Sequence, residues 1–253
     1  MKKENKTNKS YYTNHWQQYQ GQDIPSSKIN AAGHFLDPVI QKFPKRKIHI
    51  LDAGCGDGVH WRYLRSLPTQ QFLFEGIDIA PSVINHLTNH SVHAEDHFQV
   101  MDLENLDFPD NHFDVVYAFG VIGYCENPQK CFRELCRVCK QEGFLGIYSP
   151  NISGMKRFLF NSLRACCQLL GMKATQSIAR ILIPFYGMLP STSKMTQRNS
   201  SVDQIEEVIM TNIAPPHLEF LSHGLLISWF ETEGFNIFYD DPQEMNIIWG
   251  EKL

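Results

Sequence analysis

The stretch Ile50-Leu51-Asp52-Ala53-Gly54-Cys55-Gly56-Asp57-Gly58 decides the fold of this chain. Its apolar beginning is typical of a buried strand, and the three glycines at alternate positions allow a tight turn before a helix. Unpaired backbone N–H groups point outward at a helix N-terminus, so a ligand can lie against the bare backbone there. The stretch therefore predicts a strand, a glycine-rich turn and a helix that together form a nucleotide site.

Three aspartates mark the same kind of position. Asp52 lies inside the turn, Asp78 ends the second candidate strand and Asp102 ends the third. Open α/β sheets bind their ligands at the carboxyl ends of strands. A carboxylate accepts hydrogen bonds from two ribose hydroxyls and repels a phosphate, which favours an adenosine without a 2′-phosphate. A dinucleotide fingerprint would need a third glycine at position 59, where the chain has Val59, and this disfavours NAD.

Short apolar runs alternate with segments of helical spacing around the turn. The strand candidates are IHILDAG, FLFEGIDI, HFQVMDL, FDVVYAFG and FLGIYSP. Helical spacing is found over Gly58–Leu67, Pro81–Asn89 and Asn127–Lys140, with Cys136 and Cys139 on one face of the last segment. This alternation predicts an α/β fold with a doubly wound, mostly parallel sheet.

The alternation stops after residue 150 and resumes near the end of the chain. Ser222 can cap a helix that Gly234 stops, and FNIFY and MNIIW form two closing strands. Between them, Ser201 and Gln204 can form the capping box of another helix. We therefore expect a disordered tail over residues 1–10, a core over 11–150, a helical lid over 151–221, and a closing helix and strands over 222–253.

The lid segment has an unusual charge. Residues 151–202 contain seven basic residues and no acidic one, although the formal charge of the whole chain is -4. A helical stripe in this segment consists of Met155, Phe158, Leu159, Leu163, Cys166 and Leu170, and the positions opposite are Arg157, Asn161, Arg164 and Gln168. Three interpretations stay open: a packed lid with a basic solvated face, peripheral contact with an anionic membrane, and a pocket for an anionic small acceptor. Nucleic acid is disfavoured, because no recognised RNA-binding module accompanies the charge.

Composition places the chain among ordinary globular proteins. Its 253 residues are 43% hydrophobic and 20% charged, so disorder over most of the length is excluded. No apolar stretch approaches the roughly 20 residues that span a bilayer. The polar N-terminus predicts no signal peptide, and seven cysteines without framework spacing favour a reducing, cytoplasmic environment. The pair Cys136 and Cys139 lacks a second pair or neighbouring histidines, so no metal site is expected.

Together these residues resemble those of the class I S-adenosylmethionine-dependent methyltransferases, in particular the small-molecule enzymes with a DxGxGxG turn. Asp52 to Gly58 matches that turn in full, and the stretch Asp102 to Val116 is similar to the family segment that leads into the fourth strand. The resemblance covers residues 11–150 well and 222–253 more loosely. It implies a Rossmann-like sheet of seven strands with a reversed last strand.

The resemblance also implies roles for single residues. Its cofactor set is Asp52, Gly54, Gly56, Asp78, Ile79, Asp102, Leu103 and Phe119. By that resemblance the two glycines face the methionine part of S-adenosyl-L-methionine and Asp78 accepts from the ribose hydroxyls. Asp102 accepts from the adenine amino group, Leu103 contacts the ring through its backbone, and Phe119 lies near the sulfonium. Tyr12, Trp16 and Tyr19 share one face of a helix that is similar to the family segment covering the cofactor.

Catalytic candidates are fewer, because orientation alone can drive an in-line methyl transfer. Family members often place a histidine after the fourth strand, where this chain carries Tyr124, which can hydrogen-bond or stack on a substrate or simply pack. His217 follows two prolines and is the first candidate for a general base. We expect methyl transfer to an O, N or C atom of a small-molecule or lipid-like acceptor, with S-adenosyl-L-homocysteine as product. The alternative is a non-catalytic cofactor- or partner-binding protein with the same fold, and the oligomeric state stays open.

Overall fold

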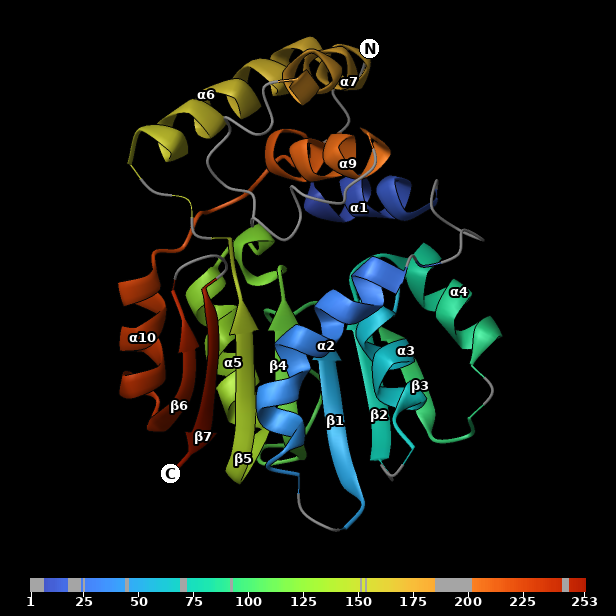
Figure 1. Cartoon of the computed structure of the whole chain (residues 1–253), viewed down its shortest axis with the longest axis vertical. Helices are drawn as coiled ribbons and strands as arrows, with labels where there is room; N and C mark the ends of the chain where they lie inside the picture. Colours follow the sequence, from blue (N-terminus) through green and yellow to red (C-terminus); the bar gives the residue numbers. More distant parts are fainter. Residues whose placement is uncertain are drawn as a thin grey trace.

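A computed structural model describes residues 7–17, 24, 26–43, 46–68, 72–91, 93–150, 152, 154–184, 202–242 and 246–253 (Figure 1). Predicted features that involve Tyr19, Ser201 or the side chain of Gln204 lie outside the described residues. Among the described helices, none is long and apolar enough to cross a membrane.

A single seven-stranded sheet organises the chain. Its strands are β1 (Ile48–Ala53), β2 (Phe72–Asp78), β3 (Asp96–Val100), β4 (Phe113–Phe119), β5 (Cys139–Tyr148), β6 (Phe235–Asp241) and β7 (Ile247–Lys252). They lie in the order β3-β2-β1-β4-β5-β7-β6, and β7 runs antiparallel to both of its neighbours. The predicted doubly wound, mostly parallel sheet with a reversed last strand is therefore confirmed.

Helices cover both faces of the sheet (Figure 1). On one face α2 (Ser26–Ile40), α3 (Val59–Ser66) and α4 (Pro81–His90) bury apolar residues that include Phe35, Leu64 and Leu87. On the other face α5 (Pro128–Val138) and α10 (His223–Thr232) bury Phe132 and Phe230. Because both faces are covered, the central strands are apolar almost throughout, as parallel strands of such sheets are.

Four further helices of the described part of the chain lie above the carboxyl ends of the strands (Figure 1). They are α1 (Asn8–Gln17), α6 (Gly154–Leu170), α7 (Met172–Leu182) and α9 (Val202–Ile213). The last three share a hydrophobic cluster of their own with the segment 214–220, built around Phe160, Ile209 and Phe220. The short 3-10 turn η1 (Ile122–Tyr124) joins this layer to β4.

Three sequence predictions need correction. Helix α1 begins at Asn8, inside the predicted tail, because the Asn8 side chain bonds to distant backbone. Helix α5 ends at Val138 and Cys139 already belongs to β5, so Cys136 and Cys139 do not share a helical face.

The third correction concerns the orientation of α6. Arg164, expected on a solvated face, is buried and donates hydrogen bonds to the carbonyl oxygens of Asn212 and Leu218 at 3.1 and 2.8 Å. The stripe that contains Met155 and Phe158 is mostly exposed instead, although Leu163 of this stripe packs against the lid cluster. Both sides of α6 carry apolar residues, so the sequence pattern did not determine which side packs inward.

Candidate functional site

A cavity of about 440 Å³ lies at the carboxyl ends of the strands, beneath α1 and α9. Its floor comes from the glycine turn, the ends of β2 and β4, and the segment after β3. Its lining residues are Thr7, Asn8, Lys9, Tyr12, His15, Trp16, Gly54, Gly56, Asp78, Ile79, Asp102, Leu103, Glu104, Phe119, Gly120, Val121, Tyr124, Cys125, Glu126, Glu207 and Thr211. Seven of the eight residues in the predicted cofactor set are thus brought together in one cavity.

The glycine turn leaves room only for glycine. Gly54 and Gly56 have φ values of +84° and +49°, a region that other residues rarely adopt. A Cβ atom on Gly54 would lie 2.7 Å from Val121, and one on Gly56 would lie 3.0 Å from the ring of Trp16. The N–H groups of Gly54 and Cys55 donate to the Ile77 carbonyl oxygen, which ties the turn to the end of β2. Bare backbone therefore faces the cavity, as a closely approaching ligand requires.

The Asp78 carboxylate is held rigidly at the end of β2. One oxygen accepts from the Gly56 N–H at 3.2 Å, and the other accepts from the Ala80 N–H at 2.9 Å. Burial raises the pKa of Asp78 to about 6, and the backbone donors partly oppose that effect. Above that pH the side chain presents an ionised acceptor to the cavity.

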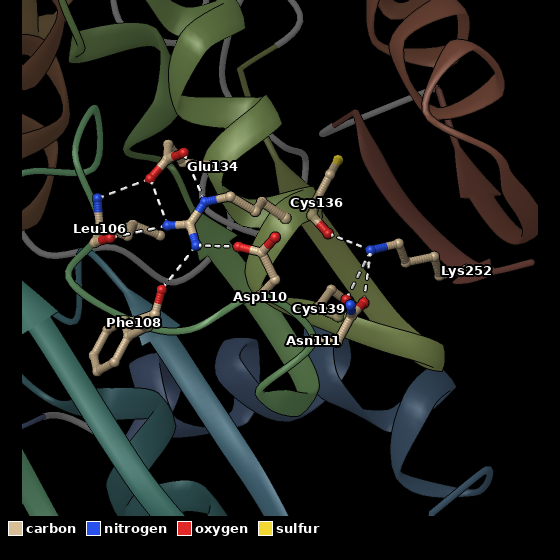
Figure 2. A network of polar contacts seen from close by, with 9 residues as sticks. Leu106, Phe108, Asp110, Asn111, Glu134, Cys136, Cys139 and Lys252 are labelled. Atoms are coloured by element: carbon tan, nitrogen blue, oxygen red, sulfur yellow. Dashed lines mark hydrogen bonds and ion pairs between the residues drawn. The ribbon is translucent and has the colours of Figure 1, made fainter.

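Asp102 and Leu103 lie on the segment that follows β3, and Arg137 of α5 fixes this segment. The guanidinium donates to the carbonyl oxygens of Leu106 and Phe108 at 2.9 and 2.8 Å and to the carboxylates of Asp110 and Glu134 (Figure 2). Glu134 in turn accepts from the Leu106 N–H at 2.9 Å. The segment after Asp102 and Leu103 is thus anchored by α5, which shares a hydrophobic cluster with Leu103 and Leu106.

Phe119 and Ile79 complete the predicted cofactor contacts. The Phe119 ring stacks on Tyr148 with centroids 4.2 Å apart and meets Phe35 at 5.1 Å, so its orientation is fixed by packing. Ile79 follows Asp78 directly and lines the cavity beside it. Both residues line the cavity, and their contacts with a cofactor stay predictions.

Helix α1 forms part of the roof. Tyr12, His15 and Trp16 line the cavity, and Trp16 lies against Gly56. Asn8 fixes the start of the helix, because its side-chain amide donates to the His217 carbonyl oxygen at 2.9 Å and accepts from the His217 N–H at 3.0 Å. The predicted aromatic helix therefore covers the cavity with two of its three expected rings.

Tyr124 lies at the end of the cavity beneath α9. Its hydroxyl donates to the Thr211 carbonyl oxygen at 3.0 Å, and its ring meets Tyr12 edge-on at 5.5 Å. Burial raises the pKa of Tyr124 to about 12, so the hydroxyl stays protonated at neutral pH. It can orient a substrate but does not serve as a proton acceptor in its ionised form.

Two predicted site residues do not line the cavity. Asp52 is fully buried beneath the turn, with the His60 ring nitrogen 3.9 Å away and Tyr117 beside it. His217 contributes backbone hydrogen bonds to Asn8, while its Nε2 is buried and has no hydrogen-bond partner among the described residues. Any role for Asp52 in cofactor binding is therefore exerted through the turn, and His217 lacks the access that a general base needs in this conformation.

Carboxylates dominate the charge of the cavity. Among the described residues, Asp78, Asp102, Glu104, Glu126 and Glu207 line it together with one lysine, Lys9. The described basic residues of the lid contribute nothing to the lining. A lining of this kind favours ligands with positive charge, such as a sulfonium, over anions.

Several lining residues were missed by sequence reasoning. Asn8 lay in the expected tail, and Glu207 and Thr211 belong to α9, which carries no recognisable motif. His15 sits between the aromatic residues of α1 and could have been noticed there; burial lowers its pKa to about 4, so it is neutral at pH 7. Only the packing of α1 and α9 over the sheet brings these residues to the cavity.

Comparison with known proteins agrees with this geometry. Residues 51–147 match a family model described as a methyltransferase domain. Over 117 residues the chain is 32% identical to malonyl-[acyl-carrier protein] O-methyltransferase of Buchnera aphidicola, covering 45% of this chain and 43% of that one. It is 27% identical to phosphoethanolamine N-methyltransferase 3 of Arabidopsis thaliana over 124 residues, or 47% and 24% of the two chains. The chain thus matches less than half the length of either relative.

The fold is also found in a solved structure of magnesium protoporphyrin IX methyltransferase from Synechocystis PCC 6803 with bound S-adenosylhomocysteine. That structure has a TM-score of 0.60 and 11% sequence identity, and the match covers 97% of this chain and 98% of the other. The matched domain includes the glycine turn, Asp78, Asp102 and Phe119. With its glycine turn and its sheet order, the chain has the fold of the class I methyltransferases, and its residues 51–147 match the methyltransferase domain.

Proposed function

We propose that this protein transfers a methyl group from S-adenosyl-L-methionine to a small-molecule or lipid-like acceptor. The observation that carries the proposal is the convergence of Gly54, Gly56, Asp78, Asp102 and Phe119 on one cavity in the family's fold. When bound, the cofactor supplies a methyl group activated by its sulfonium charge.

The described residues fit such a cofactor. Gly56 exposes backbone in a turn that has no space for a side chain, and Asp78 offers a fixed carboxylate to ribose hydroxyls. Asp102 lines the same cavity, where its carboxylate can accept from an adenine amino group. We propose that these residues, with Ile79 and Leu103, bind the cofactor, and that Phe119 packs beside its sulfonium.

The acceptor end of the cavity lies under α1 and α9, beside Tyr12, Tyr124 and Thr211. Aromatic rings there can hold the acceptor in line with the methyl group and keep water away, which is the main requirement of a displacement at carbon. The carboxylates nearby make an anionic acceptor a poor fit, so we propose an acceptor that is neutral or cationic at its reacting end. Peripheral contact of residues 151–202 with an anionic membrane would suit a lipid-like acceptor.

The test is direct. Calorimetry should show binding of S-adenosylhomocysteine, and Asp78→Ala should weaken it by about 1.5 to 3 kcal/mol, since charge-assisted hydrogen bonds are lost. Asp107→Ala, in a residue that does not line the cavity, is the matched control. Unchanged affinity in the Asp78 variant would refute the assignment of the cavity. If the protein binds S-adenosylhomocysteine tightly but forms none from S-adenosyl-L-methionine with any acceptor tested, it is a non-catalytic binding protein.

A further inference from the structure

The outer face of the lid is unusually apolar. Eleven large hydrophobic side chains are exposed in the described part of the chain, and seven of them lie on α6 and α7. These seven are Met155, Phe158, Leu159, Leu169, Leu170, Met172 and Ile181, which we call the lid apolar face. Met155, Phe158 and Leu169 are 80%, 69% and 88% exposed. At about 100° per residue, the five exposed apolar residues of α6 fall within roughly a third of the circumference of the helix, and exposed apolar residues gathered in this way mark interaction surfaces.

The packing of α6 and α7 explains why this face points outward. Phe160, Arg164 and Cys167 of α6 and Ala179 of α7 are buried in the lid cluster against α9 and the segment 212–220. Both helices lie at the end of the molecule farthest from the sheet (Figure 1). Helix α6 is about 25 Å long at 1.5 Å per residue, so the face is long enough to lie flat on an extended surface.

The charge around this face selects the partner. Neither α6 nor α7 contains an acidic residue, and Arg157, Lys173 and Arg180 are exposed along them. Arg180 is paired with Glu206 of α9, which leaves Arg157 and Lys173 as the exposed basic groups without an ion pair among the described side chains of α6 and α7. A second copy of the chain would bring like charges together, whereas anionic lipid headgroups complement them.

We propose that the lid apolar face docks on an anionic lipid surface, with Phe158 and Leu169 entering the headgroup–acyl boundary and Arg157 and Lys173 contacting the headgroups. This docking extends the proposed function, because it names a surface that would bring the cavity to lipid-like acceptors. It does not depend on methyl transfer, since no described residue of α6 or α7 lines the cavity.

Vesicle sedimentation of the full chain tests the proposal. Wild type should pellet with phosphatidylcholine vesicles that contain phosphatidylglycerol, bind pure phosphatidylcholine more weakly, and lose binding as salt is raised. The variant Phe158→Ser/Leu159→Ser/Leu169→Ser should lose at least about ten-fold in partitioning. In the variant Arg157→Ser/Lys173→Ser, partitioning to anionic vesicles should fall by roughly five-fold for each residue replaced. Arg164 is unsuitable for this test, because its substitution would disturb the buried contacts of the lid.

Two controls separate the outcomes. Val100→Ser removes an exposed apolar residue on β3, outside the lid, and should partition like wild type. Binding of S-adenosylhomocysteine, measured on the same samples, should be unchanged in all three variants, so a failure of docking is distinguishable from a failure of the proposed function. The proposal is overturned if wild type does not pellet at low salt, if the triple variant pellets equally, or if light scattering shows that the face forms a dimer.

Discussion

At the scale of single residues, burial sets the protonation of two histidines. His60 is buried beneath the glycine turn against Phe119 and Tyr117, and His15 is buried in the roof of the cavity. Burial disfavours the charged imidazolium and lowers the pKa of His60 to about 3 and that of His15 to about 4. Both side chains are therefore neutral at physiological pH.

His60 makes folding stability depend on pH. In the unfolded chain its pKa is near 6.5, so between about pH 6.5 and 3 the unfolded state binds a proton that the folded state does not. The contribution of neutral His60 to stability is complete above pH 6.5 and is lost as pH falls. The variant His60→Phe has no imidazole to protonate and so lacks this loss. As pH falls from 7 to 5, its free energy of unfolding should rise by about 2 kcal/mol relative to that of wild type.

Urea unfolding at both pH values measures this difference. The variant must be compared with wild type at each pH, because Asp78 changes the stability of both proteins. Its raised pKa makes the folded state more stable as pH falls from about 6 to 4, which opposes the effect of His60. His97→Gln, on an exposed position of β3, is the control and should show no such relative gain. An equal shift in both variants would mean that burial of His60 is not the cause.

At the scale of elements, α5 holds the segment after β3 in place, although no described residue of α5 lines the cavity. Arg137→Ala removes the guanidinium that ties Leu106, Phe108 and Asp110 to this helix (Figure 2). We expect S-adenosylhomocysteine binding to weaken by about ten-fold, because Asp102 and Leu103 would no longer be held in place before the ligand arrives. Arg133→Ala on the same helix removes only an exposed ion pair with Glu233 and should bind like wild type.

Calorimetry on the two variants decides the point. Circular dichroism should show that Arg137→Ala keeps its secondary structure, since the sheet and α5 retain their apolar contacts. An unchanged affinity in Arg137→Ala would show that the segment after β3 holds its conformation without the network.

Local patterns predicted the elements of the core better than those of the roof. The glycine turn, the apolar strands and the Ser222 cap, whose hydroxyl accepts from the Leu225 N–H, depend on residues close in sequence. The start of α1 depends on Asn8 meeting His217, 209 positions away, and no local pattern reports such a contact. The orientation of α6 depends on Arg164 finding free carbonyl oxygens at the end of α9. The same distinction explains why the sequence pointed to the cavity floor and to Tyr124, whereas Asn8, Glu207 and Thr211 were missed.

At the scale of the whole molecule, the chain has separate hydrophobic clusters for the two faces of the sheet and for the lid. The cavity lies between them and is closed by α1 and α9, whereas α6 and α7 pack above α9 and contribute no described lining residue. A ligand that binds the folded state stabilises the elements it contacts and those coupled to them. Cofactor binding should therefore stabilise some helices of the roof against local unfolding more than others.

Amide hydrogen exchange with and without S-adenosylhomocysteine tests this expectation. Exchange should slow in α1, around Tyr12 and Trp16, and in the glycine turn, while the exposed side of α6 should exchange at the same rate in both states. Anionic vesicles should produce the reverse pattern if the lid apolar face docks on lipid, slowing α6 and leaving the turn unchanged. Uniform protection of all four roof helices by the cofactor would show instead that the lid and the cavity open as a single unit, because ligand contacts at α1 and α9 would then be transmitted through the whole lid cluster.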